Sequence, residues 1–142
     1  MNEQLTPLSA TCPIRVRFNE TDAMNVVWHG NYIRYFEDAR DAFADKYGID
    51  YHRVKEEGFL LPIVDVQCSY KRSLTFGDAI EASCTLAISN AAKIIFYYEL
   101  RNARTKEIVA TGKTIQVFLN LSGELQLYIP SFFEEWKKKY LP

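Results

Sequence analysis

Apolar and polar residues alternate along much of this chain in the way that half-buried β-strands require. In residues 12–19 the apolar positions are Ile14, Val16 and Phe18. The same alternation recurs in residues 61–70, 80–88 and 94–100, and residues 108–120 form a further long strand-like run. Short turn-forming segments separate the later runs, and connections this short join antiparallel strands. The pattern therefore predicts a five-stranded antiparallel sheet.

A helical period replaces the alternation in residues 31–47, which contain no Gly or Pro. Gly48 follows in the position that commonly ends a helix. On a helical wheel the apolar side chains form a broad stripe centred on Phe36. Its members are Tyr32, Ile33, Ala39, Phe43, Ala44 and Tyr47. A shorter amphipathic pattern after Pro130 predicts a C-terminal helix. One long helix and one antiparallel sheet predict an α+β fold in which the sheet curls over the helix.

Composition excludes several classes of protein. The chain has 142 residues, of which 48% are hydrophobic and 25% charged, as expected for one globular domain spanning residues 1–142. A net charge of −1 argues against nucleic-acid binding. No apolar run is long enough to span a membrane. Cys12, Cys68 and Cys84 lack disulfide-framework or zinc-ligand spacing, which favours a reducing, cytoplasmic location.

The segment from Glu20 to Tyr32 joins the first strand to the long helix and contains Asp22 and His29. At a helix N-terminus the first backbone N–H groups lack internal partners and carry the positive end of the helix dipole. Such groups can stabilise an oxyanion, and an upstream carboxylate can attack a carbonyl or activate water. This arrangement suits acyl transfer, although many strand–loop–helix junctions share it.

The order of residues makes the interpretation specific. Residues 16–40, VRFNETDAMNVVWHGNYIRYFEDAR, resemble the signature of hotdog-fold acyl-CoA thioesterases of the 4-hydroxybenzoyl-CoA thioesterase-like group. Within that group they are most similar to the Tol-Pal-associated subset. The likeness continues in residues 70–78, 96–101 and 110–112. It implies the hotdog fold, a five-stranded antiparallel sheet wrapped around one long central helix.

The resemblance also implies roles for individual residues. Asp22 matches the catalytic carboxylate, as nucleophile or general base. Backbone amides near His29 and Gly30 match those that polarise the thioester carbonyl. The His29 side chain is expected to orient the loop or contact substrate, and substrate contacts are also expected at Gly30, Asn31 and Tyr32.

Two cations, Lys71 and Arg72, lie beside the Gly77-Asp78 turn and are candidates for binding the phosphates of coenzyme A. Exposed cations near a turn are also commonly only solvated. In one respect the sequence departs from the family pattern, because Asn25 stands where a glycine is usual. Asn tolerates the left-handed backbone region better than other non-glycine residues, so we expect the loop to keep its shape.

Three further residues leave alternatives open. Glu37, on the border of the buried helical face, is a reserve candidate for the catalytic carboxylate. Arg40 falls inside the aromatic face and must have a partner if buried, which favours a structural ion pair. A metal site built from Asp22, His29 and Glu37 is disfavoured, because His52 has no ligand spacing to His29.

The resulting prediction is a thioesterase that hydrolyses an acyl-CoA or acyl-carrier-protein thioester without a cofactor. A non-catalytic hotdog module that binds acyl groups or partner proteins is the alternative, and a dehydratase with a histidine base is a third reading. Open sheet edges, and apolar residues such as Ile95 and Ile115 on the outer face, predict a homodimer joined edge to edge, with a tetramer as the larger option.

Overall fold

The computed structural model describes residues 4–142, and its centre is a five-stranded antiparallel sheet. In spatial order the strands are β1 (Leu5–Arg15), β4 (Ala79–Ala87), β5 (Lys93–Asn102), β6 (Ile108–Val117) and β3 (Ile63–Tyr70). β2 (Phe59–Leu60) and β7 (Leu119–Asn120) form a separate two-stranded ribbon. The predicted α+β hotdog architecture is confirmed.

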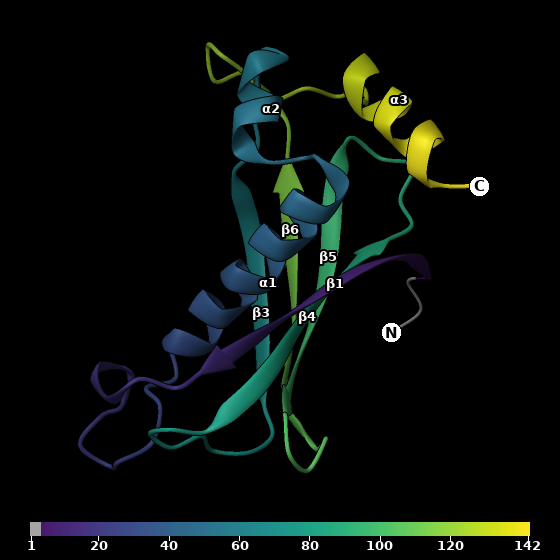
Figure 1. Ribbon diagram of the computed structural model, residues 1–142. Coiled ribbons are helices and arrows are strands. Elements are labelled where there is room, and N and C mark those ends of the chain that lie inside the picture. Colours follow the sequence, from purple (N-terminus) through teal and green to yellow (C-terminus); the bar gives the residue numbers. More distant parts are fainter. Residues whose placement is uncertain (1–3) are drawn as a thin grey trace.

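Three helices accompany the sheet: α1 (Asn31–Tyr47), α2 (Tyr51–Glu56) and α3 (Ser131–Tyr140). Figure 1 shows α1 lying across one face of the sheet, with α2 and α3 near the end at which α1 finishes. The loop that leads into α1 lies at the opposite end. Both the long central helix and the C-terminal helix were predicted.

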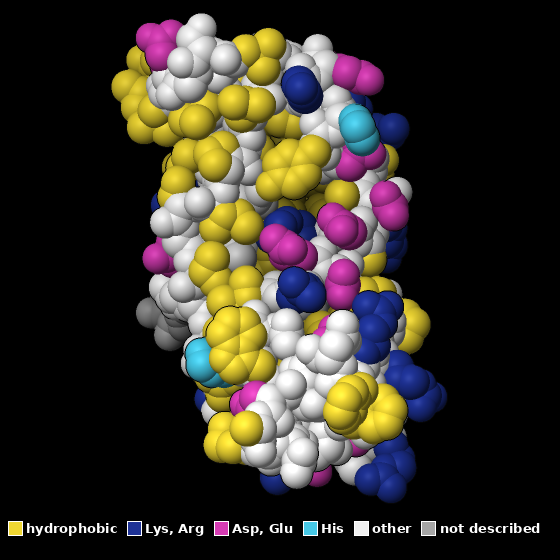
Figure 2. Space-filling model, turned by 90° about the vertical axis from the view of Figure 1, so that its left-hand side faces the viewer, with side chains coloured by type: hydrophobic (Ala, Val, Ile, Leu, Met, Phe, Trp, Pro, Cys, Tyr) yellow, Lys and Arg dark blue, Asp and Glu magenta, His cyan; other side chains and the backbone are white. Residues whose placement is uncertain are grey.

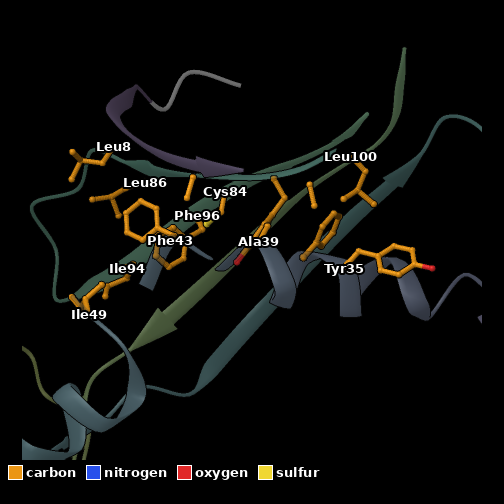
Figure 3. Close-up of a cluster of buried hydrophobic side chains, with 14 of the residues drawn as sticks. Leu8, Tyr35, Ala39, Phe43, Ile49, Cys84, Leu86, Ile94, Phe96 and Leu100 are labelled. Atoms are coloured by element: carbon orange, nitrogen blue, oxygen red, sulfur yellow. The ribbon is translucent and has the colours of Figure 1, made fainter. Parts of the chain in front are cut away.

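Packing between α1 and the sheet forms the core. Most residues predicted to alternate inward over 80–88 and 94–100 are buried: Ile80, Ala82, Cys84, Leu86, Ile94, Phe96, Tyr98 and Leu100. Ile88, also in that set, follows the end of β4 and is exposed. Figure 3 shows Phe43 of α1 lying beside Phe96 of β5, and their ring centroids are 4.9 Å apart. Burying each such side chain contributes ~1.5–3 kcal/mol to the free energy of unfolding.

A glycine in β6 lets α1 approach the sheet closely. Phe36 stacks on Tyr98 with 4.7 Å between ring centroids. A Cβ atom at Gly112 would lie 2.2 Å from the Phe36 ring, so no larger residue fits there without movement. The helix ends as predicted at Gly48, which has the left-handed φ of 68°.

The first strand differs from its prediction over residues 12–19. It begins at Leu5 and ends at Arg15, and Phe18 lies in a 3₁₀ turn, η1 (Phe18–Glu20), with 73% of its surface exposed. The prediction did not include residues 5–11, but the structure places Pro7 in β1, an edge strand in which a missing N–H is tolerated. The alternation stops because Arg17 N–H donates to the Glu20 carboxylate at 2.7 Å and closes the turn.

Helix α2 was not predicted, since its six residues are too few to show a helical period. Asp50 caps it by accepting a hydrogen bond from Arg53 N–H at 2.8 Å. The buried Arg40 forms the expected ion pair, with Glu37 at 3.6 Å. None of the helices within residues 4–142 is both long and apolar enough to cross a membrane.

Candidate functional site

The loop between η1 and α1 is held in a tight, closed shape by its own backbone. Thr21 and Val27 form an isolated antiparallel bridge. Inside it, Asp22 N–H donates to Val26 O and Asn25 N–H donates to Asp22 O, each at 2.9 Å. Asn25 has a φ of 65°, so it occupies the left-handed region. Asn25 thus adopts the left-handed conformation that the sequence led us to expect at this position.

Asp22 is partly buried, and one of its carboxylate oxygens supports the loop. Oδ1 accepts a hydrogen bond from Met24 N–H at 2.8 Å. No protein donor within residues 4–142 is bonded to Oδ2. The side chain is therefore oriented by one oxygen and has the other available for chemistry.

Asp22 lines a shallow pocket of about 330 Å³. The residues around it are Asp22, Met24, Val26, Val27, His29, Tyr32, Tyr70, Lys71, Arg72 and Ser73. Five of the predicted site residues thus meet at one place, although they come from the loop, the start of α1 and the segment after β3. Gly30 and Asn31 do not line the pocket directly.

The start of α1 presents backbone donors beside this pocket. Asn31 N–H donates to Trp28 O at 2.9 Å, and Tyr32 N–H donates to His29 O at 3.3 Å. In the part of the chain that the structure describes, the N–H groups of His29 and Gly30 have no protein acceptor. Two donors are consequently available to an oxyanion at the positive end of the helix.

The contacts of Gly30 and Asn31 explain why their side-chain positions do not line the pocket. The Trp28 ring lies against Gly30, where a Cβ atom would be 2.2 Å from it. The Asn31 side-chain amide donates to Glu20 O at 2.9 Å and ties the helix start to η1. The Asn31 side chain therefore contacts the loop backbone, and a contact of Asn31 with substrate stays a prediction.

His29 is exposed and held through its backbone. Its carbonyl accepts a hydrogen bond from the Tyr70 hydroxyl at 2.8 Å. Its ring lies 5.0 Å from that of Trp28 and 6.4 Å from that of Tyr70, measured between centroids. Loss of hydration, followed by the Cys68 thiol, raises the pKa of Tyr70 to about 12, so its hydroxyl remains a donor at neutral pH. No hydrogen bond joins His29 to Asp22 among the described residues.

Sequence reasoning missed Glu20, which holds the entrance to the loop. Only 6% of its surface is exposed. Its Oε1 accepts from Arg17 N–H at 2.7 Å and from the Tyr35 hydroxyl at 3.0 Å. Burial, and then the bond to Glu20, raise the pKa of Tyr35, which keeps that hydroxyl protonated. The available signal was a second acid only two residues before Asp22, within the same motif.

The two candidate cations have different surroundings. Lys71 is exposed at the pocket. Arg72 forms a salt bridge with Glu107 at 2.7 Å, and both side chains are substantially exposed. The Arg72 carbonyl accepts from the Tyr32 hydroxyl at 3.2 Å, which fixes this segment against α1. Glu37 does not line the pocket.

A helix wrapped by an antiparallel sheet, with a carboxylate and helix-terminal amides at one pocket, defines a hotdog protein of the thioesterase type. Residues 16–137 match the family model of the thioesterase-like superfamily. A Bacillus subtilis relative, named provisionally as the acyl-CoA thioesterase YneP, is 34% identical over 128 residues, covering 89% of this chain and 91% of the relative.

Solved structures agree with this assignment. A DHNA-CoA thioesterase from Staphylococcus aureus superposes with a TM-score of 0.81 at 26% identity, covering 92% of this chain and 90% of that one. A protein from Thermus thermophilus, TT1821, superposes with a TM-score of 0.80 at 29% identity, covering 92% and 98%. The chain belongs to the thioesterase-like superfamily, and the predicted enzyme class, thioester hydrolase, is confirmed.

Proposed function

We propose that this protein hydrolyses the thioester of an acyl-CoA, with Asp22 as the catalytic carboxylate. The observation that carries the proposal is the pocket at the start of α1. There, within residues 4–142, a carboxylate with one oxygen available lies on the same loop as two N–H groups without protein acceptors. Relatives named as acyl-CoA thioesterase and 1,4-dihydroxy-2-naphthoyl-CoA hydrolase support this class of substrate.

In the proposed reaction the thioester oxygen accepts hydrogen bonds from the N–H groups of His29 and Gly30. These donors stabilise the negative charge that develops on that oxygen when the carbonyl carbon is attacked. Asp22 either attacks the carbon itself, releasing the thiolate and leaving an anhydride for water to cleave, or removes a proton from the attacking water. Both routes yield a free acid and a thiol.

Coenzyme A carries phosphates, for which Lys71 and Arg72 are the proposed partners. Lys71 is exposed and needs no rearrangement. Arg72 must leave Glu107 or share its guanidinium with it. Two inferences from the sequence stay predictions: that the acyl group can be carried by an acyl-carrier protein, and that the chain belongs to the Tol-Pal-associated subset.

Release of thiol from a panel of acyl-CoA esters tests the proposal. The panel runs from acetyl to palmitoyl and includes benzoyl, phenylacetyl and 1,4-dihydroxy-2-naphthoyl esters. We expect at least one ester to be hydrolysed with a kcat well above the uncatalysed rate. Binding of esters without release of thiol from any of them would instead identify a non-catalytic acyl-binding module.

We expect His29→Asn to lower kcat by about 10-fold, because it removes ring contacts that help to orient the loop. The backbone bond from Tyr70 to the His29 carbonyl can persist in this variant. In the wild type, kcat/KM should rise with pH through a single acidic limb and then stay flat to about pH 8. A second limb that disappears in the His29→Asn variant would show that the imidazole transfers a proton, as in the dehydratase reading.

The two edges of the sheet differ in their protection against pairing. β1 carries Pro7 and Pro13, whereas β3 contains no proline and exposes 59% of Val64 and 38% of Val66. Ile95, expected on the exposed outer face, is buried opposite Ile115, so that face is a weaker basis for assembly. An unprotected apolar edge favours pairing with another chain.

We therefore propose a homodimer through the edge of β3, with the pocket beside Tyr70 close to the junction. The wild type should sediment as a dimer at micromolar concentration, and Val66→Lys should raise the dissociation constant by about 10-fold or more by placing charge on the edge. Thr11→Lys, on the β1 edge, is the matched control and should leave the dimer intact. A wild-type monomer under these conditions would contradict the proposal, and a tetramer would extend it.

A further inference from the structure

A second pocket, of about 310 Å³, lies toward the C-terminal end of α1. Its walls come from α1, α2, β5 and β6, and it shares no lining residue with the pocket at Asp22. Figure 2 shows a hollow on one face of the molecule, bordered by hydrophobic side chains and by a group of acidic ones. The thioester reaction proposed above uses none of the residues that line this second pocket.

The most informative residue in the wall is Gln116 of β6, which is 2% exposed. Its Nε2 donates to Leu61 O at 2.9 Å. Its Oε1 has no hydrogen-bond partner, the one buried side-chain polar atom of residues 4–142 for which this holds. Turning the amide over would place Oε1 against the Leu61 carbonyl, so the observed orientation is the favourable one.

Arg40 lines the same pocket and is also incompletely paired. Its guanidinium donates to the Tyr98 hydroxyl at 3.4 Å and meets Glu37 at 3.6 Å, and both contacts are long. A guanidinium has five N–H donors, which exceeds the number of these contacts. The pocket therefore combines an acceptor that lacks a donor with a donor group that can serve a further acceptor.

The remaining wall limits the kind of molecule that fits. Apolar side chains, including Phe43, Ile94 and Phe96, supply most of the lining. Asp41, Asp45 and Asp50 also line the pocket and oppose the entry of an anion. A hydroxyl group can donate to Gln116 Oε1 or accept from Arg40, and it carries no charge.

We propose that this pocket is a binding site for a neutral small molecule with an apolar body and a hydroxyl group that donates to Gln116 Oε1. The volume lies within the usual range of ligand sites, and a few polar groups in an apolar wall are typical of them. The site is separate from the thioester pocket within one protomer. If this second binding site is disproved, the proposed thioester hydrolysis at Asp22 is unaffected, because the two pockets share no lining residue.

The test uses 4-ethylphenol as the probe and the full chain as the protein. Binding is measured by calorimetry, and its place by the NMR shift of the Gln116 side-chain amide. 4-Ethylanisole, which cannot donate a hydrogen bond, and 4-ethylbenzoate, which is an anion, are the matched ligands. We expect 4-ethylphenol to bind saturably and about 5- to 10-fold more tightly than 4-ethylanisole.

Two variants distinguish the effect of the hydrogen bond to Gln116 from the effect of filling the pocket. Gln116→Leu removes the acceptor at similar volume and should abolish the preference for 4-ethylphenol over 4-ethylanisole. Ala44→Leu places a larger side chain in the pocket wall and should weaken both ligands by about 10-fold or more. Gln126→Leu makes the same chemical change outside the pocket and should alter neither affinity. Thermal unfolding of each variant shows that it is folded.

Several results would overturn the proposal. If neither phenol nor anisole binds up to its solubility limit, the pocket holds water only. Equal affinity for the two would show that Gln116 Oε1 recognises no donor. If 4-ethylbenzoate binds more tightly than 4-ethylphenol, the pocket prefers an anion and the proposed neutral ligand is wrong. If Ala44→Leu leaves the affinity for 4-ethylphenol unchanged, the ligand binds outside this pocket.

Discussion

We expect Asp22→Asn to lower kcat for thioester hydrolysis by ~100-fold or more, as is typical for loss of a general base or nucleophile. The substitution removes the negative charge that attacks the carbonyl or activates water. It keeps an oxygen that can accept the Met24 N–H, which now bonds Oδ1 at 2.8 Å, so the loop should hold its shape. Steady-state kinetics on the best ester of the panel measure the effect.

Asp78→Asn is the matched control for this variant. Asp78 also supports a turn with its carboxylate, accepting from Thr75 N–H at 2.9 Å, but it does not line the pocket. Its substitution should change kcat by less than about twofold. Near-normal turnover in Asp22→Asn, together with intact binding of acyl-CoA, would remove Asp22 from the chemistry and return attention to Glu37 or His29.

The second large effect is expected from Glu20→Ala, which should lower the free energy of unfolding by ~3 kcal/mol. The change leaves the Tyr35 hydroxyl and Arg17 N–H without their buried acceptor, and hydrogen bonds to charged groups contribute ~1.5–3 kcal/mol each. The loop that carries Asp22 begins at this residue, so kcat should also fall, by ~10-fold or more, while the chemistry stays the same. Urea unfolding and kinetics on the same preparation measure both effects.

Tyr35→Phe separates the two donors, since it removes only one of the bonds to Glu20. We expect the free energy of unfolding to fall by ~1.5 kcal/mol, and kcat to change less than in Glu20→Ala. For a positioning residue the pH profile of kcat/KM should keep its shape in both variants. If Glu20→Ala and the wild type have the same midpoint of urea unfolding, the Glu20 carboxylate contributes nothing to the stability of the protein.

Local sequence patterns predicted the structure correctly where the conformation of a residue depends mainly on its neighbours in the chain. The bounds of α1 could be predicted because residues 31–47 lack Gly and Pro and Gly48 adopts the left-handed conformation that ends the helix. The buried faces of β4 and β5 followed from alternation alone. The start of β1 did not follow from alternation, because its first residues are placed by pairing with β4 in a register that shifts between Leu5 and Ser9, around Pro7.

The site was predictable in part for the same reason. Asp22, Asn25 and His29 belong to one continuous motif, whose residue order resembles that of a known family and whose loop closes through its own backbone. Glu20 was missed because its partner is Tyr35, which the helical wheel placed outside the apolar stripe. The burial of Glu20 depends on how α1 packs against η1, and a sequence pattern over a few residues does not predict that packing.

The sequence by itself determined the succession along the chain of the five long strands, α1 and α3, the limits of α1, and the loop motif that contains Asp22 and His29. These depend on backbone preferences and on side-chain periods that operate within a few residues. Only the tertiary structure decided that Tyr70 holds the His29 carbonyl, 41 residues away, and that Gln116 meets Leu61 across 55 residues. Such contacts form only when distant segments of the chain pack together. Burial then makes each unpaired polar atom unfavourable to the free energy of folding, and the local sequence does not show which atoms will be buried.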